Sequence, residues 1–536
     1  MKMNKAALKN KSEWDKVSVA LPQYDCELMC DATNKAPTWV HFGAGNIFRG
    51  FIAVLAQRLL NEGLMNTGII AADTFDYDII DEIYTPFDNL TMMITLGADS
   101  TTKREIIGSV AEGLHADSAD AKHIARLHEI FCAPSLQMVS FTITEKGYAL
   151  TRSDGSLLPV VQEDIDDGPS KARHAMSMIA ALLFERYKAG HLPIAMVSMD
   201  NCSHNGEKLQ TSVMTIAKEW LQKDYVDAGF IEYLSNEKLV SFPWSMIDKI
   251  TPRPAPSVKI SLEKDGIEDM SPIITRKNTF IAPFVNAERP QYLVVEDKFP
   301  NGRPPLEKAG VYMTDRDTVN RTERMKVTTC LNPLHTAMSV YGCLLGYNLI
   351  CDEMKDADIV KLVETLGYKE GLPVVTDPKI LSPKAFIDEV VRERLPNPFM
   401  PDAPARIATD TSQKVGIRFG ETIKSYIALK RDVNELVALP LAIAGWMRYL
   451  LAIDDNGNEM PVSDDPLKDE LQAQLADIRV GEPSTYTGQL KPILANASIF
   501  GTDLVAAGLC EKIEKYFVRL LAGNGAVRTT LHDALN

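Results

Sequence analysis

Residues 38–63 constrain the fold more than any other stretch of the chain. A short apolar run, typical of a buried strand, leads into the glycine-rich turn GAGNIFRG at 43–50, and helical periodicity follows at 51–60. Strand, glycine turn and helix in this order can hold a pyrophosphate, because the glycines let the backbone approach the anion and the helix N-terminus attracts it. Phe48 stands where the usual fingerprint has its third glycine, so the turn alone is a weak signal.

A second strand is predicted at 68–72 and ends in Asp73. A carboxylate at this position binds the ribose hydroxyls of NAD and repels the additional phosphate of NADP. The alternative is a turn residue with a solvated side chain, and the preceding glycine turn favours the ribose contact. Arg49 either pairs with a phosphate or covers the helix surface. The candidate NAD contacts here are Gly43, Gly45, Asn46, Ile47, Arg49 and Asp73.

Two further apolar strands are predicted at 136–143 and 192–198, with a helix at 171–188 between them. Uninterrupted apolar strands alternating with helices are typical of a parallel sheet that is buried on both faces. Polar residues just after such strands face the ligand crevice of a doubly wound fold. The candidates by this rule are Glu145, Lys146, Asp200 and Asn201; the alternative for Asp200 and Asn201 is that they only form a turn.

The chain has 536 residues, too many for one hydrophobic core. We expect an irregular lead-in at 1–37, an α/β domain of the Rossmann type at 38–290 and a mainly helical domain at 291–536. The proline-rich stretch 241–254 is interpreted as a loop, and 292–296 as one more strand. Helical periodicity recurs after residue 300, at 334–347, 355–366, 383–394, 416–430, 434–452, 467–478 and 502–522.

Composition excludes several classes of function. The formal net charge of -15 disfavours nucleic acid and anionic membranes as partners. The N-terminus has no apolar core behind its lysines, and the most apolar later stretch, 436–453, contains Pro440 and Arg448; a cytoplasmic protein without membrane spans is therefore expected. The eight cysteines are scattered and the histidines show no ligand spacing, so no metal site is predicted.

The stretch 321–335, RTERMKVTTCLNPLH, offers a lysine, an asparagine and a histidine at the junction of two predicted helices. The first helix would begin at Asp315 or Asp317, and the second would have Asn332 as its N-cap. A lysine made neutral by its surroundings can take a proton from an alcohol, and the positive end of a helix stabilises the resulting alkoxide. We therefore interpret Lys326, Asn332 and His335 as catalytic residues, the alternative being a solvated lysine beside a helix cap.

A polar stretch at 405–414 contains Arg406 and Lys414, two cations eight positions apart. They could hold an anion or a polyol, although a solvated loop is the more common reading of such a stretch.

Together these features resemble the long-chain mannitol and polyol dehydrogenase family, over residues 38–530. The resemblance is carried by GAGNIFRG, TITEKGY, the MDN ending in Asn201, SMIDKITP around Asp248, VVEDKFPNGRPPLEKAGV, ERMK with LNPLH, and RIATDTSQK. It implies zinc-independent hydride transfer between NAD and a secondary alcohol. It further implies Lys326 as general base, Asn201, Asn332 and His335 around the reacting oxygen, acidic Glu145 and Glu323 near the lysine, and Asp248, Arg406 and Lys414 in the substrate pocket. Lys326 and Asn332 are separated by one residue more than is usual in the family.

The resemblance predicts an NAD-dependent dehydrogenase that interconverts a keto-sugar acid and its alcohol, with D-fructuronate and D-mannonate favoured because Arg406 and Lys414 could hold a carboxylate. The alternatives are a mannitol 2-dehydrogenase or other polyol dehydrogenase, a tagaturonate reductase and, from another class, an NADH-binding sensor without catalysis. The partner is then a small sugar acid or polyol. The sequence does not determine the oligomeric state.

Overall fold

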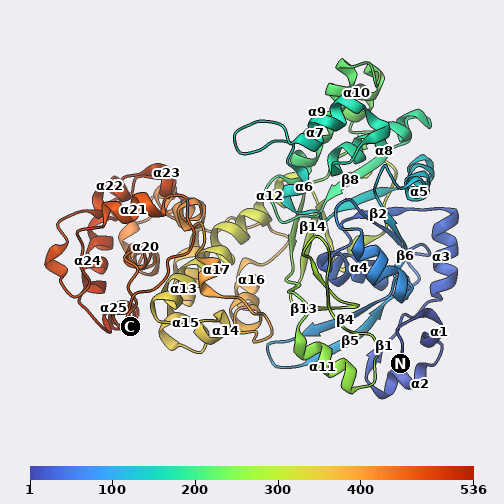
Figure 1. The fold of residues 1–536 in the computed structure, drawn as a ribbon. Coiled ribbons are helices and arrows are strands. Elements are labelled where there is room, and N and C mark those ends of the chain that lie inside the picture. Colours follow the sequence, from blue (N-terminus) through green and yellow to red (C-terminus); the bar gives the residue numbers. More distant parts are fainter. The chain divides into compact units, whose positions relative to one another are not determined.

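The computed structural model describes residues 1–536 and divides into two compact units (Figure 1). The first comprises Met1–Leu96 and Ser100–Asn320, and the second comprises Gly97–Asp99 and Arg321–Asn536. The division falls within helix α12 (Arg316–Met325), later than the predicted boundary at 290, because the strands after residue 290 complete a sheet of the first unit.

A six-stranded parallel sheet is the centre of the first unit, with the order β6, β3, β2, β7, β8, β9. The chain begins in the middle of this sheet and extends it in both directions, which is the doubly wound arrangement, so the predicted fold class is confirmed. The strands are β2 (Trp39–Phe42), β3 (Ile69–Asp73), β6 (Val110–His115), β7 (Met138–Phe141), β8 (Ile194–Ser198) and β9 (Val240–Ser241).

Both faces of this sheet are buried, which explains why its strands are apolar throughout. Val40 and Phe42 belong to a core formed with α5 (Ala121–Cys132), α8 (Ala175–Lys188), α9 (Asn205–Gln222) and α10 (Ala228–Ser235). Trp39 faces the opposite core, formed with the π-helical turn η1 (Phe48–Ile52) and α4 (Ala53–Asn61). The alternation follows from the two-residue period of a strand.

Three smaller sheets accompany the central one. The predicted loop at 241–254 is wrong in part, because Ser245–Asp248 forms strand β10 between the flanking prolines and pairs with β14. The lead-in is also more ordered than predicted. It contains α1 (Lys5–Leu8), α2 (Lys11–Lys16), β1 (Val19–Ala20) and α3 (Cys26–Lys35). The remaining strands are β4 (Thr91–Leu96), β5 (Thr102–Ile107), β11 (Ile273–Ile274), β12 (Phe280–Ile281), β13 (Phe284–Glu288), β14 (Tyr292–Glu296) and β15 (Tyr312–Thr314).

The second unit is helical, as the periodicity predicted. Helix α20 (Ala438–Tyr449) is buried along its whole length, and Arg448 donates to the carbonyls of Leu520, Ile453 and Asp454. None of the helices combines the length and apolar character needed to cross a membrane. The other longer helices of the second unit are α13 (Asn332–Leu344), α15 (Ala357–Glu364), α16 (Pro383–Glu389), α19 (Glu421–Ala428), α21 (Lys468–Gln474), α24 (Cys510–Leu520) and α25 (Ala526–Leu535).

Candidate active site

The glycine turn after β2 borders a cavity of about 750 Å³ in the first unit. Gly43 has φ +102°, and a Cβ atom on it would lie 2.1 Å from the carbonyl oxygen of Thr142, so only glycine fits there. The cavity is also lined by Asp73, Lys146, Arg173 and Lys277. A volume of this size, glycine backbone and three cations fit a dinucleotide with its phosphates.

Asp73 holds the glycine turn as well as lining the cavity. Its Oδ2 accepts the N–H of Ala44 at 3.0 Å, and its Oδ1 accepts those of Phe75 and Asp76 at 2.9 and 2.8 Å. Burial raises the pKa of the Asp73 carboxyl, although these three N–H groups oppose the rise. The Asp73 side chain is buried, so the alternative of a solvated turn residue is wrong, and Oδ2 keeps one lone pair for a further donor.

The other predicted cofactor contacts fall into two groups. Gly45 and Lys146 line the cavity, whereas Asn46, Ile47, Arg49 and Glu145 are not among its lining residues. Arg49 points into the interior with 0% exposure and donates to Asn46 and to the carbonyl of Ala282, so it neither covers the surface nor faces the cavity. Glu145 is exposed and pairs with Lys208.

Asp200 connects the ends of β7 and β8. Its carboxylate accepts the backbone N–H groups of Ile143 and Thr144, each at 2.9 Å, and the hydroxyl of Tyr148 at 2.6 Å. It therefore positions the cavity-lining segment that contains Lys146. Asn201 follows directly and is exposed.

Asp248 ends strand β10 and is 8% exposed. The start of the same strand is fixed by Asn205, which donates to the backbone carbonyl of Ser245 and accepts its N–H, both at 3.0 Å. Asn201 thus follows the end of strand β8, and Asp248 ends strand β10. The buried residues Asp200 and Asn205 hold these two segments of the first unit.

Lys326 begins the π-helical turn η6 (Lys326–Cys330), directly after α12. The N–H of Leu331 donates to the Lys326 carbonyl at 3.1 Å, five residues back instead of four. This turn therefore holds one residue more than a regular helical turn. Asp315 accepts the N–H of Thr318 at 2.8 Å, which confirms it as the N-terminal cap of α12. The Lys326 side chain is 2% exposed.

Asn332 is the first residue of α13 and not its N-cap, which is Leu331; no side chain caps this helix. One turn later, Nε2 of His335 lies 3.3 Å from Oδ2 of Asp402, while Oδ1 of Asp402 accepts from Arg406 at 2.9 Å. Burial alone would raise the pKa of Asp402, but His335 and Arg406 outweigh it and hold this pKa below its usual value. Asp402 therefore links the predicted histidine to one of the predicted substrate cations.

Lys414 and Arg418 lie next to each other in the second unit. Lys414 donates to the carbonyl of Thr409, and burial followed by the charge of Arg418 lowers the Lys414 pKa. Arg418 belongs to η10 (Gly416–Gly420) and donates to the Thr336 hydroxyl, and no carboxylate contributes to its pKa shift. Burial lowers its pKa to about 10.

The structure thus gathers one group of predicted residues in each unit. In the second unit, η6 contacts α13, and η10 contacts both, so the elements that carry Lys326, His335 and Arg418 pack together. Arg418 was not predicted, although it follows Lys414 by four positions and therefore shares its helical face. Arg173 and Lys277 were also missed, because they reach the cavity from segments far apart in the chain.

Two family models together match most of the chain. The model of the mannitol dehydrogenase Rossmann domain matches residues 37–308, and that of the mannitol dehydrogenase C-terminal domain matches residues 318–521. The chain belongs to the mannitol dehydrogenase family. The predicted class, an oxidoreductase that acts on a secondary alcohol, is thereby confirmed.

Among members of the mannitol dehydrogenase family, D-mannonate oxidoreductase of Thermotoga maritima is 51% identical over 538 residues, covering 100% of this chain and 99% of that protein. Mannitol 2-dehydrogenase of Pyrenophora tritici-repentis is 31% identical and covers 87% of this chain and 76% of that protein. The solved ternary complex of Pseudomonas fluorescens mannitol 2-dehydrogenase with NAD and D-mannitol has a TM-score of 0.70 at 26% identity, covering 100% and 99% of the two chains.

Proposed function

We propose that this protein is a D-mannonate oxidoreductase that interconverts D-mannonate and NAD with D-fructuronate and NADH. The 51% identity to the Thermotoga maritima enzyme supports this choice within the family. The structural observation that carries it is Arg418, a largely buried guanidinium whose hydrogen-bonding partner in the protein is a hydroxyl and not a carboxylate. Such a cation is suited to a substrate carboxylate, which a sugar acid has and a polyol lacks.

Arg418 would share that carboxylate with neighbouring cations. Lys414 lies close enough for its pKa to respond to the charges of Arg418 and Arg406. Asp402 pairs with Arg406, and Asp410 and Asp465 act on the pKa of Lys414, whereas burial is the only cause of the lowered Arg418 pKa. Arg418 is therefore the cation of this group that is best placed to accept a substrate carboxylate as its partner.

In the oxidation of mannonate, Lys326 takes the hydroxyl proton as general base. Asn332 and His335, at the N-terminal turn of α13, stabilise the developing alkoxide together with the positive end of that helix. Preorganised donors of this kind contribute about 2.7–4 kcal/mol each where they have been removed singly. Bound NAD supplies the hydride acceptor.

The test is a spectrophotometric panel in which NADH oxidation is followed with D-fructuronate, D-tagaturonate and D-fructose, with and without a chelator. We expect rapid oxidation with fructuronate, weak or absent oxidation with the other two, and no effect of the chelator. Turnover of fructose alone would make the protein a mannitol 2-dehydrogenase, and turnover of tagaturonate alone would make it a tagaturonate reductase. NADH binding without turnover of any of them would favour the sensor.

Mannitol 2-dehydrogenase is the second candidate, because 31% identity to the Pyrenophora tritici-repentis enzyme extends over 87% of this chain. Arg406 and Lys414 fit either substrate, since they can hold hydroxyls as well as a carboxylate. Replacement of Arg418, described below, tests which of the two candidates applies.

Exchanging Asp73 for asparagine should change the cofactor preference. Asparagine keeps one oxygen for the N–H of Ala44 or Phe75 but removes the charge that repels the NADP phosphate. We expect the ratio of kcat/KM for NADPH over NADH to rise by about 100-fold, since like charges in contact cost several kcal/mol. Asp76 to asparagine, which removes a charge from the same cavity wall, is the matched control. An equal change in both variants would contradict the ribose contact.

A further inference from the structure

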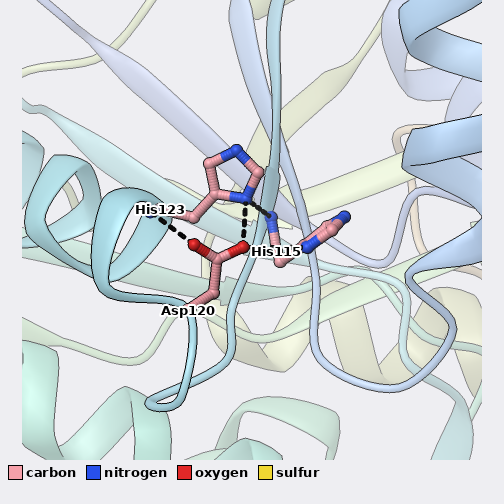
Figure 2. Close-up of side chains that lie close together, drawn as sticks. All are labelled: His115, Asp120 and His123. Carbon is pink, nitrogen blue, oxygen red and sulfur yellow. Dashed lines mark hydrogen bonds and ion pairs between the residues drawn. The ribbon is translucent and has the colours of Figure 1, made fainter.

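Two histidines and one aspartate converge where β6 ends and α5 begins (Figure 2). His115 is the last residue of β6, Asp120 is the N-cap of α5, and His123 lies in the first turn of α5. The Oδ2 atom of Asp120 lies 3.1 Å from Nδ1 of His115 and 3.0 Å from Nδ1 of His123. One atom from each of the three residues lies within 4.8 Å of the other two, which makes them a potential set of metal ligands.

Hydrogen bonds within the protein do not satisfy all of these atoms at once. The backbone N–H of His115 donates to Nδ1 of His123 at 3.2 Å, so this nitrogen presents a lone pair. Oδ2 of Asp120 lies 3.0 Å from this same Nδ1 of His123. Both atoms are then acceptors, and no proton lies between them. A proton on Nδ1 of His123 would instead face the N–H of His115. A cation shared by the oxygen and the nitrogen removes this conflict.

His115 is already oriented for the same cation. Its Nε2 lies 3.0 Å from Oδ1 of Asp81, in the turn η2 (Ile80–Tyr84). A proton on Nε2 that is donated to Asp81 leaves Nδ1 of His115 with a lone pair directed at Asp120. A carboxylate behind a histidine is the usual outer support of a metal-ligating imidazole. The ring of Tyr77 stacks on His115, with centroids 4.9 Å apart, and further fixes its orientation.

We propose that His115, Asp120 and His123 bind one divalent transition-metal ion of the Zn²⁺, Co²⁺ and Ni²⁺ group. Two imidazole nitrogens and a carboxylate suit these ions, whereas Mg²⁺ and Ca²⁺ require oxygen ligands. Three protein ligands leave a position that water completes. The side chains are 15%, 28% and 20% exposed, so the ion can enter from solvent. The N–H of His115 releases His123 on binding, which moderates the affinity.

The ion would join the end of β6 to the start of α5 at the edge of the central sheet. His115 pairs in register with Asp73, and the next residue, Ala116, donates its N–H to the Asp73 carbonyl at 2.8 Å. The ion therefore stiffens the strand end beside the cavity-lining segment 73–76 and takes no part in hydride transfer. The sequence analysis predicted no metal site, and this site is proposed from the geometry of the three side chains instead.

Titration of the full-length protein with Co²⁺ tests the proposal. We expect one saturable site with visible d–d absorption and without the thiolate-to-metal band that binding to the free cysteines would give. Asp120→Asn should weaken binding by at least about 10- to 100-fold, the loss found when only an outer-shell partner is removed. Asparagine caps helices as well as aspartate does, so α5 should remain folded in this variant.

Asp117→Asn is the matched control, because it removes the same charge from the same loop and Asp117 is not part of the ligand set. It should bind Co²⁺ within about twofold of the wild type. Circular dichroism without metal verifies that both variants fold. Absence of saturable binding, equal losses in the two variants, or a thiolate band would each overturn the proposal.

Discussion

Replacing Lys326 with alanine is expected to lower kcat for mannonate oxidation by about 1,000-fold, within the range that a positioned general base contributes. Lys326 is 2% exposed at the start of the π-helical turn η6, so water cannot take its place as a well-oriented base. Because Lys326 belongs to the second unit and the cavity to the first, NADH should still bind. Steady-state kinetics and NADH fluorescence titration measure the two effects.

The Lys326→Met variant is the control for a loss of activity that is caused by misfolding. Methionine fills the volume of the buried side chain without a charge, so the fold should be retained while turnover is lost. Lys355→Ala, at an exposed position in the same unit, should leave kcat unchanged. Turnover of both Lys326 variants within about tenfold of the wild type would show that another group takes the proton.

Replacing Arg418 with glutamine is expected to lower kcat/KM for fructuronate by about 10- to 100-fold, mainly through KM, since a hydrogen bond to a charged group contributes about 1.5–3 kcal/mol. Glutamine can still reach Thr336 but cannot pair with a carboxylate. Any residual activity toward fructose, which has no carboxylate, should not fall. A loss with the charged substrate and no loss with the neutral one would distinguish recognition of the carboxylate from damage to the fold.

Arg431→Gln provides the control for this experiment, because Arg431 is a partly exposed arginine of the same unit that pairs with Glu435. It should leave both substrates unaffected. If Arg418→Gln reduced turnover of fructose and fructuronate equally, the arginine would be structural, and the preference for a sugar acid would have to come from Arg406 or Lys414.

The regular elements could be predicted because their sequence patterns are local. The buried strands β2, β3, β7 and β8 are apolar runs bounded by turn residues, and such runs have few alternatives in a doubly wound fold. Strand β10 was missed, since its prolines lie outside the four residues that pair with β14. The domain boundary was placed too early, because pairing between Val294 and Tyr312 depends on contacts that no local pattern records.

The residues of the candidate site could be proposed from the sequence, but their contacts could not. Motif order made Lys326, Asn332 and His335 candidates, but it could not show that Arg49 is buried or that Asp73 holds the glycine turn. Both facts depend on the path of backbone N–H and carbonyl groups in three dimensions. The three residues of the proposed metal site lie within a stretch of nine residues, yet whether they converge depends on the turn between β6 and α5.

The turn η6 determines the spacing between Lys326 and the residues that follow it. In a regular α-helix each residue turns the chain by about 100°, and hydrogen bonds join residues that are four apart. The hydrogen bond from the N–H of Leu331 to the Lys326 carbonyl spans five residues, so this single turn holds one residue more than a regular turn. Deletion of one residue from 327–330 would therefore be accommodated by closing η6 into a regular turn, which would leave Asn332 and His335 in place relative to Lys326.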